Sequence, residues 1–589
     1  MLHPWPIDEL TRMACLACAG IALLTGATAP SAAAERRAHS AYEPPDPTPD
    51  AGAAATWDSV SAGLHGALGS LDVRYPRNAA PGLPAGPRWS ASGWRGERVS
   101  AQFVLWSIAP VSQLRLDVSP LRSASGGSIA ASARFVRYVL ADTVLAPDIL
   151  DDAKRLDMPE RTARPVWVSV DIPSDAAPGI YEGTLSARGE GTAVLEFPLR
   201  IEVLPLDLPA PRDWSFHLDL WQNPYAVARY HHVTPWSPEH FALLRPLYRM
   251  LADAGQKCLT TTIIDAPWGG QTYDPYGSMV GWTKAKDGAW RFDYTAFDRY
   301  VRFARECGLD GWINCYSMVP WTNSIRYYDE ARGESMNQEI RPDTDDYERM
   351  WAPFLKDFTA HLKRKGWLSR TVMAMDERPW EMMKPAIAML HRYGPGLRLA
   401  LAGDNEPRVQ GEVNDWSVII NSAISEDMLR SRSERGALTT FYVCTGPERP
   451  NTFTYSPPAE AAWMGLYAAA RHMDGFLRWA YDCWVEDPLW DTKHVTWQSG
   501  DCFLVYPGPR SSIRFERLRE GIQQYEKVRL LRERCAGRNH PELAALESAL
   551  KGFTFEQVNA EPAAEAVNRA EAAIEALSRA VTADRPTHS

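Results

Sequence analysis

Two neighbouring carboxylates, Asp376 and Glu377, directly follow the short apolar run of residues 371–375. Pro379 and Trp380 come next and open a segment of helical character. Acidic side chains at the end of a buried strand suit chemistry better than packing, because sites on barrels and doubly wound sheets gather at the carboxyl ends of strands. The alternative is a helix start, where Asp and Glu favour the first turn. The pair alone leaves both interpretations open.

The surrounding chain predicts the element that would position this pair. Apolar strand candidates alternate with segments of helical periodicity, and the connection between the fifth and sixth strands is the shortest. Eight such units within residues 212–490 predict an α/β fold with a (β/α)8 TIM-type barrel. A doubly wound sheet is the weaker alternative, because no Gly-rich phosphate loop follows a strand. The candidate strands are residues 215–221, 258–264, 311–315, 371–375, 397–402, 415–420, 438–443 and 475–481.

Different patterns flank the predicted barrel. Residues 56–207 carry short β-branched and aromatic strands separated by turn signals, which predicts an N-terminal β-sandwich domain. The Pro-rich stretch 204–211 marks the boundary between this domain and the barrel. Residues 491–589 predict a C-terminal region of one strand at 501–506, a helix at 512–534 and a helical pair within 540–582. We expect this helical and extended tail to pack on the barrel.

The N-terminus resembles an export signal. Arg12 precedes an apolar run, and small residues ending at Ala34 follow it, so residues 1–34 predict a signal peptide and an exported, periplasmic or extracellular protein. Residues 35–55 are rich in Pro, Ala and Asp and predict a disordered spacer. No later stretch approaches the length of a membrane span. The seven cysteines beyond the signal are widely spaced, which predicts mostly buried thiols and no disulfide framework, with a single bridge after export as the alternative.

Composition and the absence of several motifs reduce the number of possible functions. The formal net charge of -10 argues against a nucleic-acid partner. The sequence has no HExxH zinc signature, no G-x-S-x-G elbow and no nucleotide loop, so neither a metal nor a cofactor is predicted. Most of the 23 Trp lie between Trp221 and Trp497. Most of them would pack in the core, but rings at strand ends also stack on the flat faces of sugars.

Polar and aromatic residues gather after the predicted strands. As a set they describe a neutral-to-acidic pocket lined by rings, which suits a neutral, polyhydroxylated ligand. Strand-end position alone identifies the candidate substrate-binding residues Trp221, Asn223, Trp268, Asn314, Tyr316, Tyr442, Trp479, Tyr481 and Trp484.

The adjacency of Asp376 and Glu377 distinguishes two kinds of carbohydrate chemistry. Ordinary glycosidases place two carboxyls about 5 Å or more apart, on opposite sides of the scissile bond. Neighbouring residues do not easily straddle a bond in this way. They suit the substrate-assisted route, in which the sugar's own 2-acetamido oxygen is the nucleophile, one acid protonates the leaving group and its neighbour orients the amide. The expected partner is therefore a glycan with a terminal 2-acetamido sugar.

Several unusual passages resemble glycoside hydrolase family 123, the β-N-acetylgalactosaminidases. The likeness runs from about residue 90 to 530 and includes Ala374-Met-Asp-Glu-Arg-Pro379. It implies a β-sandwich beside a (β/α)8 barrel, a substrate-assisted retaining mechanism, Glu377 as general acid/base and Asp376 as stabiliser of the acetamido group. The other matching passages are residues 95–102, 218–224, 254–257, 475–481, 506–508 and 511–516.

Three alternatives stay open beside this expectation. A β-hexosaminidase-like enzyme could act on another 2-acetamido sugar, and a carbohydrate-binding protein without catalysis could use the same fold. A conventional glycosidase would need a second carboxylate at a distance from the pair. The candidates for that role are Asp219, Asp265, Asp404 and Glu406.

Overall fold

The computed structural model describes residues 39, 41–48, 55–84, 88–403 and 405–583. The predicted signal peptide and most of the predicted spacer lie outside these residues. From Glu43 onward the chain forms one compact unit. Glu43 itself is buried, and Arg164 Nη2 donates to its Oε2 at 2.8 Å. The prediction of a disordered spacer is therefore wrong at Glu43, because a buried ion pair anchors it.

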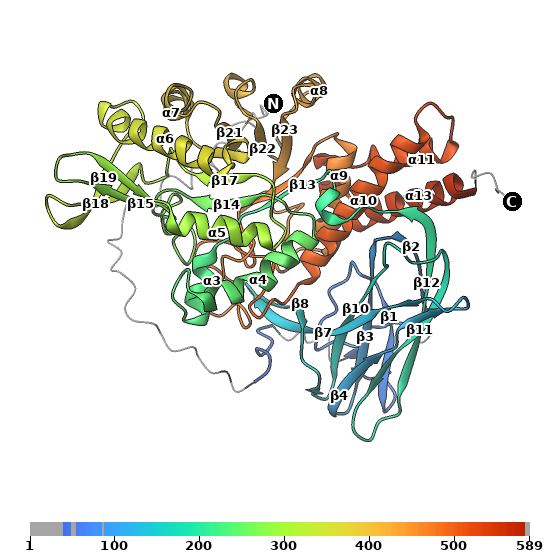
Figure 1. The fold of residues 1–589 in the computed structure, drawn as a ribbon. Coiled ribbons are helices and arrows are strands. Elements are labelled where there is room, and N and C mark those ends of the chain that lie inside the picture. Colours follow the sequence, from blue (N-terminus) through green and yellow to red (C-terminus); the bar gives the residue numbers. More distant parts are fainter. Residues whose placement is uncertain (1–38, 40, 49–54, 85–87, 404, 584–589) are drawn as a thin grey trace, which may run out of the picture. The chain divides into compact units, whose positions relative to one another are not determined.

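The N-terminal region is rich in β-structure and contains two sheets (Figure 1). Apolar side chains of both sheets, among them Phe103, Val166, Leu185 and Phe197, form one shared core. The first sheet has the order β1 (Leu64–Gly69), β3 (Arg98–Ser107), β10 (Thr162–Asp171), β7 (Ala131–Ala141) and β8 (Val144–Asp151). The second has the order β2 (Trp89–Arg95), β12 (Leu195–Asp207), β11 (Gly179–Arg188), β4 (Val111–Val118) and β9 (Leu156–Met158), with β5 (Leu121–Ser123) and β6 (Ser128–Ile129) beside β11.

An eight-stranded parallel sheet follows and nearly closes into a TIM-type barrel, as the sequence predicts. From β14 to β24 each strand pairs with the next one in chain order, β13 pairs with β24, and all eight predicted strands are present. They are β13 (His217–Leu220), β14 (Leu259–Thr262), β17 (Ile313–Tyr316), β20 (Thr371–Met375), β21 (Arg398–Ala402), β22 (Asp415–Ile419), β23 (Leu438–Tyr442) and β24 (Gly475–Arg478).

Side chains bridge the seam between β13 and β14, the two ends of this sheet. Gln256 accepts a hydrogen bond from Leu220 N at 2.8 Å through Oε1, and its Nε2 donates to Leu220 O at 3.0 Å. Gln222 donates to the same carbonyl and accepts from Thr260 N at 3.0 Å. Buried backbone groups need hydrogen-bond partners. At the seam these side-chain amides supply the partners that a paired strand would otherwise provide.

Helices connect most of the barrel strands. In the described residues, only the short turn η3 (Pro407–Val409) joins β21 to β22, as the short connection predicts. In α6 the buried residues Met350, Phe354, Phe358 and Leu362 recur every four residues, so one face covers the sheet. The helices are α3 (Pro224–His231), α4 (Pro238–Asp253), α5 (Thr295–Glu306), α6 (Asp345–Lys365), α7 (Trp380–Tyr393), α8 (Glu426–Glu434) and α9 (Pro458–Ala470).

A four-stranded sheet beside the barrel was not predicted. Its strands come from the segments after β14 and β17, in the order β16 (Trp290–Asp293), β15 (Gly281–Lys284), β18 (Ser324–Asp329) and β19 (Glu334–Glu339). Figure 1 shows β15, β18 and β19 projecting from one side of the barrel. The parallel pair β15–β18 joins the two segments.

The C-terminal region is helical. It contains α10 (Ile513–Cys535), α11 (Pro541–Leu550), α12 (Phe555–Ala560) and α13 (Ala563–Ala583). Helices α9 and α10 approach so closely that a Cβ added at Gly465 would lie 2.1 Å from Gly521 O, which requires glycine there. The predicted strand at 501–506 is wrong: this buried segment turns and forms only isolated bridges, at Phe503 and Tyr506.

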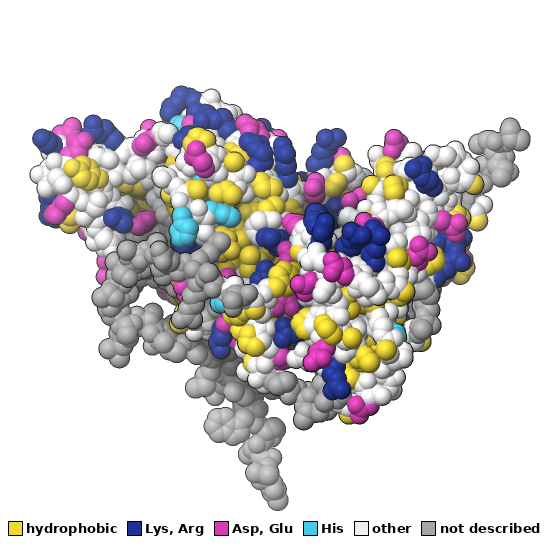
Figure 2. Space-filling view, turned by 90° about the horizontal axis from the view of Figure 1, so that it is seen from below, with side chains coloured by type: hydrophobic (Ala, Val, Ile, Leu, Met, Phe, Trp, Pro, Cys, Tyr) yellow, Lys and Arg dark blue, Asp and Glu magenta, His cyan; other side chains and the backbone are white. Residues whose placement is uncertain are grey.

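No helix in the described part of the chain is both long and apolar enough to cross a membrane. On the face drawn in Figure 2, basic and acidic side chains are interspersed among apolar and uncharged ones. Of the seven described cysteines, all except the half-buried Cys444 are buried.

Candidate active site

The acid pair lies where the barrel topology places functional groups, directly after β20. Side chains two residues apart on a strand share a face. Ala374 is in register with Tyr316 of β17, so Asp376 continues the face that carries Tyr316. Asn314, on the same face of β17, donates to Asp219 of the non-adjacent strand β13 at 3.1 Å, which shows that this face is the barrel interior. Asp376 therefore points inward at the mouth.

Asp376 is half-buried and held by an indole. Trp321 Nε1 donates a hydrogen bond to its Oδ2 at 2.9 Å. Burial raises the pKa of Asp376, and this hydrogen bond, the backbone N–H of Glu377 and the indole of Trp268 all act in the opposite direction. The hydrogen bonds favour the charged form of a carboxyl that burial would otherwise keep neutral.

Glu377 is exposed and has a different partner. The Tyr442 hydroxyl, at the end of β23, donates a hydrogen bond to Glu377 Oε1. Burial and the neighbouring Glu377 carboxylate raise the pKa of Tyr442 well above its usual value, so this phenol stays a donor. The two acids thus differ in exposure and in what holds them, although they are adjacent in the chain.

Three predicted rings form one cluster beside Asp376. The ring centroids of Trp221 and Tyr316 are 4.6 Å apart, those of Trp268 and Tyr316 are 4.9 Å apart, and those of Trp221 and Trp268 are 5.0 Å apart. All three rings are buried. Below them, Asp219 Oδ2 accepts hydrogen bonds from Trp221 Nε1 at 3.3 Å and from Asn314. The predicted residue Asn314 therefore supports the ring cluster from within the barrel.

Trp479 is a half-buried ring after β24. Its Nε1 donates to Asp501 Oδ2 at 3.1 Å, and Arg478 pairs with the same carboxylate at 2.7 Å. The ring of Trp497 stands edge-on to it, with centroids 6.2 Å apart. Trp497 in turn donates to Gln271 O in the segment after β14 at 2.8 Å. These contacts fix a second aromatic surface after the last strand.

Three other predicted residues are used for packing or capping. Asn223 is fully buried and caps α3, where its Oδ1 accepts from Tyr225 N and Ala226 N. Tyr481 is fully buried and donates to Leu247 O, and Trp484 donates to Val505 O. Because the protein itself occupies their polar groups, we assign no sugar contact to these three side chains.

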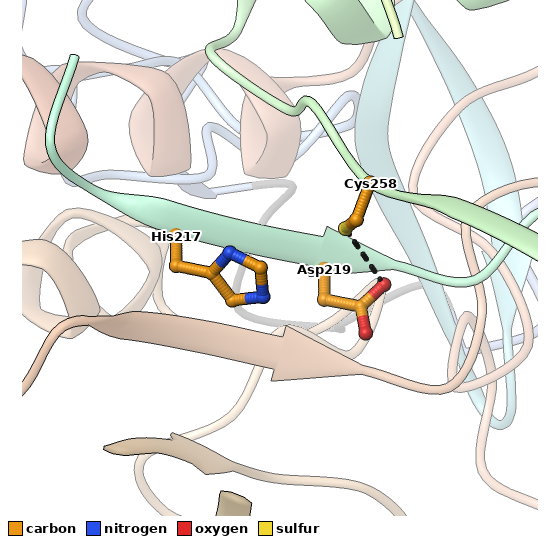
Figure 3. Close-up of side chains that lie close together, drawn as sticks. All are labelled: His217, Asp219 and Cys258. Carbon is orange, nitrogen blue, oxygen red and sulfur yellow. Dashed lines mark hydrogen bonds between the residues drawn. The ribbon is translucent and has the colours of Figure 1, made fainter. Parts of the chain in front are cut away.

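A polar layer lies deeper in the barrel. His217 and Asp219 of β13 and Cys258, just before β14, lie close together (Figure 3), and their potential metal-binding atoms are all within 4.8 Å of one another. His, Asp and Cys are the donor types that bind zinc. Each is engaged by hydrogen bonds: Cys258 Sγ to Asp219 Oδ1 at 3.2 Å, and His217 Nε2 with Asp415 Oδ2 at 3.0 Å.

This layer contacts the ring cluster through Asp219. Burial raises the pKa of Asp219 to about 6. Burial alone would lower the pKa of His217, but the neighbouring Asp415 carboxylate raises it. The hydrogen bonds account for the arrangement of this layer. Asp219 also accepts hydrogen bonds from Trp221 and Asn314 and so holds both side chains in place.

Trp321 ends the polar and aromatic stretch after the third predicted strand, but it is not among the predicted substrate-binding residues. It lies in the segment after β17, and its backbone N–H donates to Pro267 O at 2.8 Å. Arg378 lies over its ring, with the guanidinium carbon 5.1 Å from the centroid. One signal in the sequence could have found it: Pro320-Trp321 repeats the Pro267-Trp268 dipeptide after the preceding barrel strand.

A nearly closed parallel barrel with paired acids at a strand end and rings around them is the arrangement of a barrel glycosidase. The catalytic-domain model of glycoside hydrolase family 123 matches residues 221–531, and the N-terminal-domain model of that family matches residues 68–189. The chain belongs to glycoside hydrolase family 123.

One solved structure agrees with this assignment. A family 123 glycoside hydrolase from Clostridium perfringens is 26% identical, with a TM-score of 0.81, over 88% of this chain and 99% of that one. A GH5 xyloglucanase from Bacteroides ovatus is 8% identical with a TM-score of 0.29, over 74% and 98% of the two chains. A family 39 glycoside hydrolase from Bacteroides cellulosilyticus is 10% identical with a TM-score of 0.32, over 74% and 82%. A comparison with curated proteins gives no match.

Proposed function

We propose that this family 123 glycoside hydrolase removes terminal β-linked N-acetylgalactosamine by a retaining, substrate-assisted mechanism. The observation that carries the proposal is the contrast between two adjacent acids. Asp376 is half-buried and held at one oxygen by Trp321, whereas Glu377 is exposed and held by Tyr442. One group is suited to a fixed electrostatic role, and the other is suited to exchanging protons with substrate and water.

In the first step, Glu377 gives its proton to the glycosidic oxygen. The carbonyl oxygen of the substrate's 2-acetamido group attacks the anomeric carbon, the bond to the leaving group breaks, and an oxazolinium ion forms. Asp376 accepts the hydrogen bond of the acetamido N–H and stabilises the positive charge that develops there. Preoriented charges of this kind are usually the largest contribution to catalysis.

In the second step, Glu377 takes a proton from water, and the water oxygen attacks the anomeric carbon. The ring of the intermediate opens, the acetamido group is restored, and Glu377 is protonated again. Two inversions at the anomeric carbon give net retention. General acid–base catalysis of this kind contributes about 10²–10⁴-fold.

Rings around the mouth provide the sugar-binding surface in this proposal. Trp268 and Tyr316 lie on the Asp376 side, Tyr442 ends β23, and the half-buried Trp479 directly follows β24. Stacking on such rings recognises the C–H face of a sugar. The orientation of one hydroxyl at C4 separates the galacto from the gluco substrate, so a β-hexosaminidase-like specificity is tested in parallel.

The alternative mechanism, in which a second carboxylate at a distance from the pair acts as nucleophile or base, is less well supported. Asp219 is buried below the ring cluster and accepts hydrogen bonds from Cys258, Trp221 and Asn314. Glu406 forms two hydrogen bonds with Arg408, at 2.7 and 2.5 Å. Asp265 Oδ2 lies 3.5 Å from Arg326 Nη1 and forms an ion pair with it. The fourth candidate, Asp404, lies outside the described residues.

The natural substrate and the location of the enzyme are part of the proposal. The Clostridium perfringens relative is described in connection with glycolipid glycan hydrolysis. We infer that the substrate of this enzyme is a glycan or glycoconjugate with a terminal 2-acetamido sugar. We also infer that the enzyme loses residues 1–34 on export and acts outside the cytoplasm. N-terminal sequencing of the mature protein tests export.

One panel of substrates tests the activity. Nitrophenyl β-glycosides of galactose, glucose, N-acetylgalactosamine and N-acetylglucosamine are compared at equal concentration. The proposal expects turnover of the N-acetylgalactosaminide and none of the sugars without the acetamido group. Binding without turnover would support a carbohydrate-binding protein. Covalent trapping by a 2-fluoro sugar, without inhibition by an oxazoline mimic, would support a protein nucleophile.

A further inference from the structure

Two Pro–Trp dipeptides lie at the mouth of the barrel. Pro267-Trp268 follows β14, and Pro320-Trp321 follows the neighbouring strand β17. The backbone N–H of Trp321 donates to Pro267 O at 2.8 Å, so the two segments are tied together. This tie brings both indoles to the same carboxyl group, that of Asp376.

Two indoles act on the carboxyl group of Asp376. Trp321 Nε1 donates to Oδ2 at 2.9 Å. The indole of Trp268 acts on the same carboxyl group and lowers its pKa. An indole N–H is a neutral donor, so it fixes the orientation of a carboxylate without cancelling its charge. An Arg in the same place would form an ion pair and neutralise it.

The indole of Trp321 is itself fixed from several sides. The Arg378 guanidinium lies over its ring at 5.1 Å, within the range of a cation–π contact. Arg378 Nη2 also donates to Asn323 Oδ1 at 2.8 Å, two residues after Trp321. The backbone of Asn323 donates to Pro320 O at 3.1 Å and closes the turn. Trp321 therefore has little freedom to leave Asp376.

We propose that Trp321 is a positioning residue of the reaction, which holds Asp376 Oδ2 so that Oδ1 faces the acetamido N–H of the substrate. This inference rests on the proposed substrate-assisted function and deepens it. The hydrogen-bond donors to Asp376 are neutral and leave its charge available for the oxazolinium ion, while the nearby Arg378 also favours the charged form of Asp376. The fixed rotamer removes a reorganisation step from the approach to the transition state.

The test replaces Trp321 by Phe, which keeps a ring for Arg378 and removes the N–H. Loss of a hydrogen bond to a charged group corresponds to about a 10- to 100-fold loss in kcat on acetamido substrates. The acid limb of the kcat/KM profile moves to higher pH, because a hydrogen bond that favours the charged carboxylate is gone. In the Asp376→Asn background the same replacement has little further effect, because Trp321 acts through Asp376.

A matched control lies at the other end of the same strand, β17. Trp312, just before β17, is also half-buried under an arginine, with Arg398 4.5 Å from its ring centroid. Trp312→Phe is expected to leave kcat and the pH profile unchanged. If Trp321→Phe does not fold, 3-benzothienylalanine at position 321 keeps the shape of Trp and removes only the N–H.

The outcomes separate this inference from the proposed function. An unchanged pH profile in the folded Trp321 variant, or fully additive losses with Asp376→Asn, overturns the positioning role while the function stands. Full activity of Asp376→Asn on acetamido substrates, or wild-type turnover of sugars without the acetamido group, overturns the proposed function itself. Non-additive losses with a shifted acid limb support Trp321 as proposed.

Discussion

The Tyr442 hydroxyl donates a hydrogen bond to Glu377 Oε1, from the end of β23 to the end of β20, although β21 and β22 lie between these strands in the sheet. The bond fixes the carboxyl group that we propose as the acid. Tyr442→Phe removes this donor and keeps the ring. We expect kcat/KM to fall about 10-fold or more, the usual cost of a lost hydrogen bond to a charged group. Tyr455→Phe, at a half-buried tyrosine between β23 and α9, is the control. Equal rates for Tyr442→Phe and the wild type would count against the role of this contact.

Glu377→Gln should separate substrates by their leaving groups. A poor leaving group needs the proton, so its hydrolysis is expected to fall about 10²–10⁴-fold, with a smaller loss for an activated nitrophenolate. Steady-state kinetics on both substrates provide the measurement. Glu381→Gln, an exposed site in the first turn of α7, serves as the control. Equal losses on both substrates would contradict the acid role.

Asp376→Asn should affect acetamido substrates most. The amide cannot stabilise the developing positive charge, so kcat should fall about 10²-fold or more. Burial raises the pKa of Asp376, so the wild type is expected to lose activity on the acid side as this carboxyl is protonated. A kcat/KM profile against pH in both proteins provides the check. Retained acid-limb behaviour in Asp376→Asn would assign that limb to another group.

Asp482 should make stability depend on pH. Its Oδ1 accepts from Asn223 N at 2.7 Å, while Oδ2 is buried without a hydrogen bond, and burial raises its pKa from 3.8 to about 7. The folded state keeps this proton where the unfolded state loses it, so stability falls as pH rises from about 4 to 7. The shift corresponds to at most about 4 kcal/mol.

Asp482→Asn keeps an acceptor for Asn223 and carries no charge. Melting temperatures at pH 5 and pH 8 should therefore differ less in this variant than in the wild type. Asp213→Asn, an exposed site before β13, is the control. The same drop between the two pH values in Asp482→Asn and the wild type would show that another group is responsible.

Gln256 should be important for closing the barrel. Its side-chain amide satisfies both backbone groups of Leu220 at the seam between β13 and β14. Gln256→Ala removes the acceptor of the buried Leu220 N–H and one of the two side-chain donors to Leu220 O, at a cost of about 1–3 kcal/mol. Denaturant unfolding measures the loss, with exposed Gln557→Ala as the control. A change below about 0.5 kcal/mol would mean that the seam has another support.

The barrel could be predicted because its strands are short, buried and apolar and recur with helices between them. The same pattern misled at residues 501–506, because a buried apolar run has no periodicity that distinguishes a strand from a buried irregular segment. The four-stranded sheet was missed for the opposite reason. Its strand β19, Glu334–Glu339, is mostly exposed and polar, so no apolar run marks it.

The acid pair and Tyr442 were predicted as site residues from their positions at strand ends. That position does not say which way a side chain points, so Tyr481 and Trp484, which lie in the same stretch of chain, were predicted as sugar contacts although they pack inward. The partnership of Trp321 with Asp376 joins residues 55 positions apart in the chain. Only the folded barrel brings them together, because the two follow neighbouring strands, β17 and β20.

The parallel pairing of β15 with β18 links the two segments that carry Trp268 and Trp321. In an engineering experiment these segments are therefore one exchangeable module. Transplanting either segment alone from a relative would break the shared sheet and displace an indole from Asp376. Transplanting both together would preserve that contact while changing the outer surface. Evolution of specificity in this chain would face the same constraint, since insertions on one segment must be matched by the other.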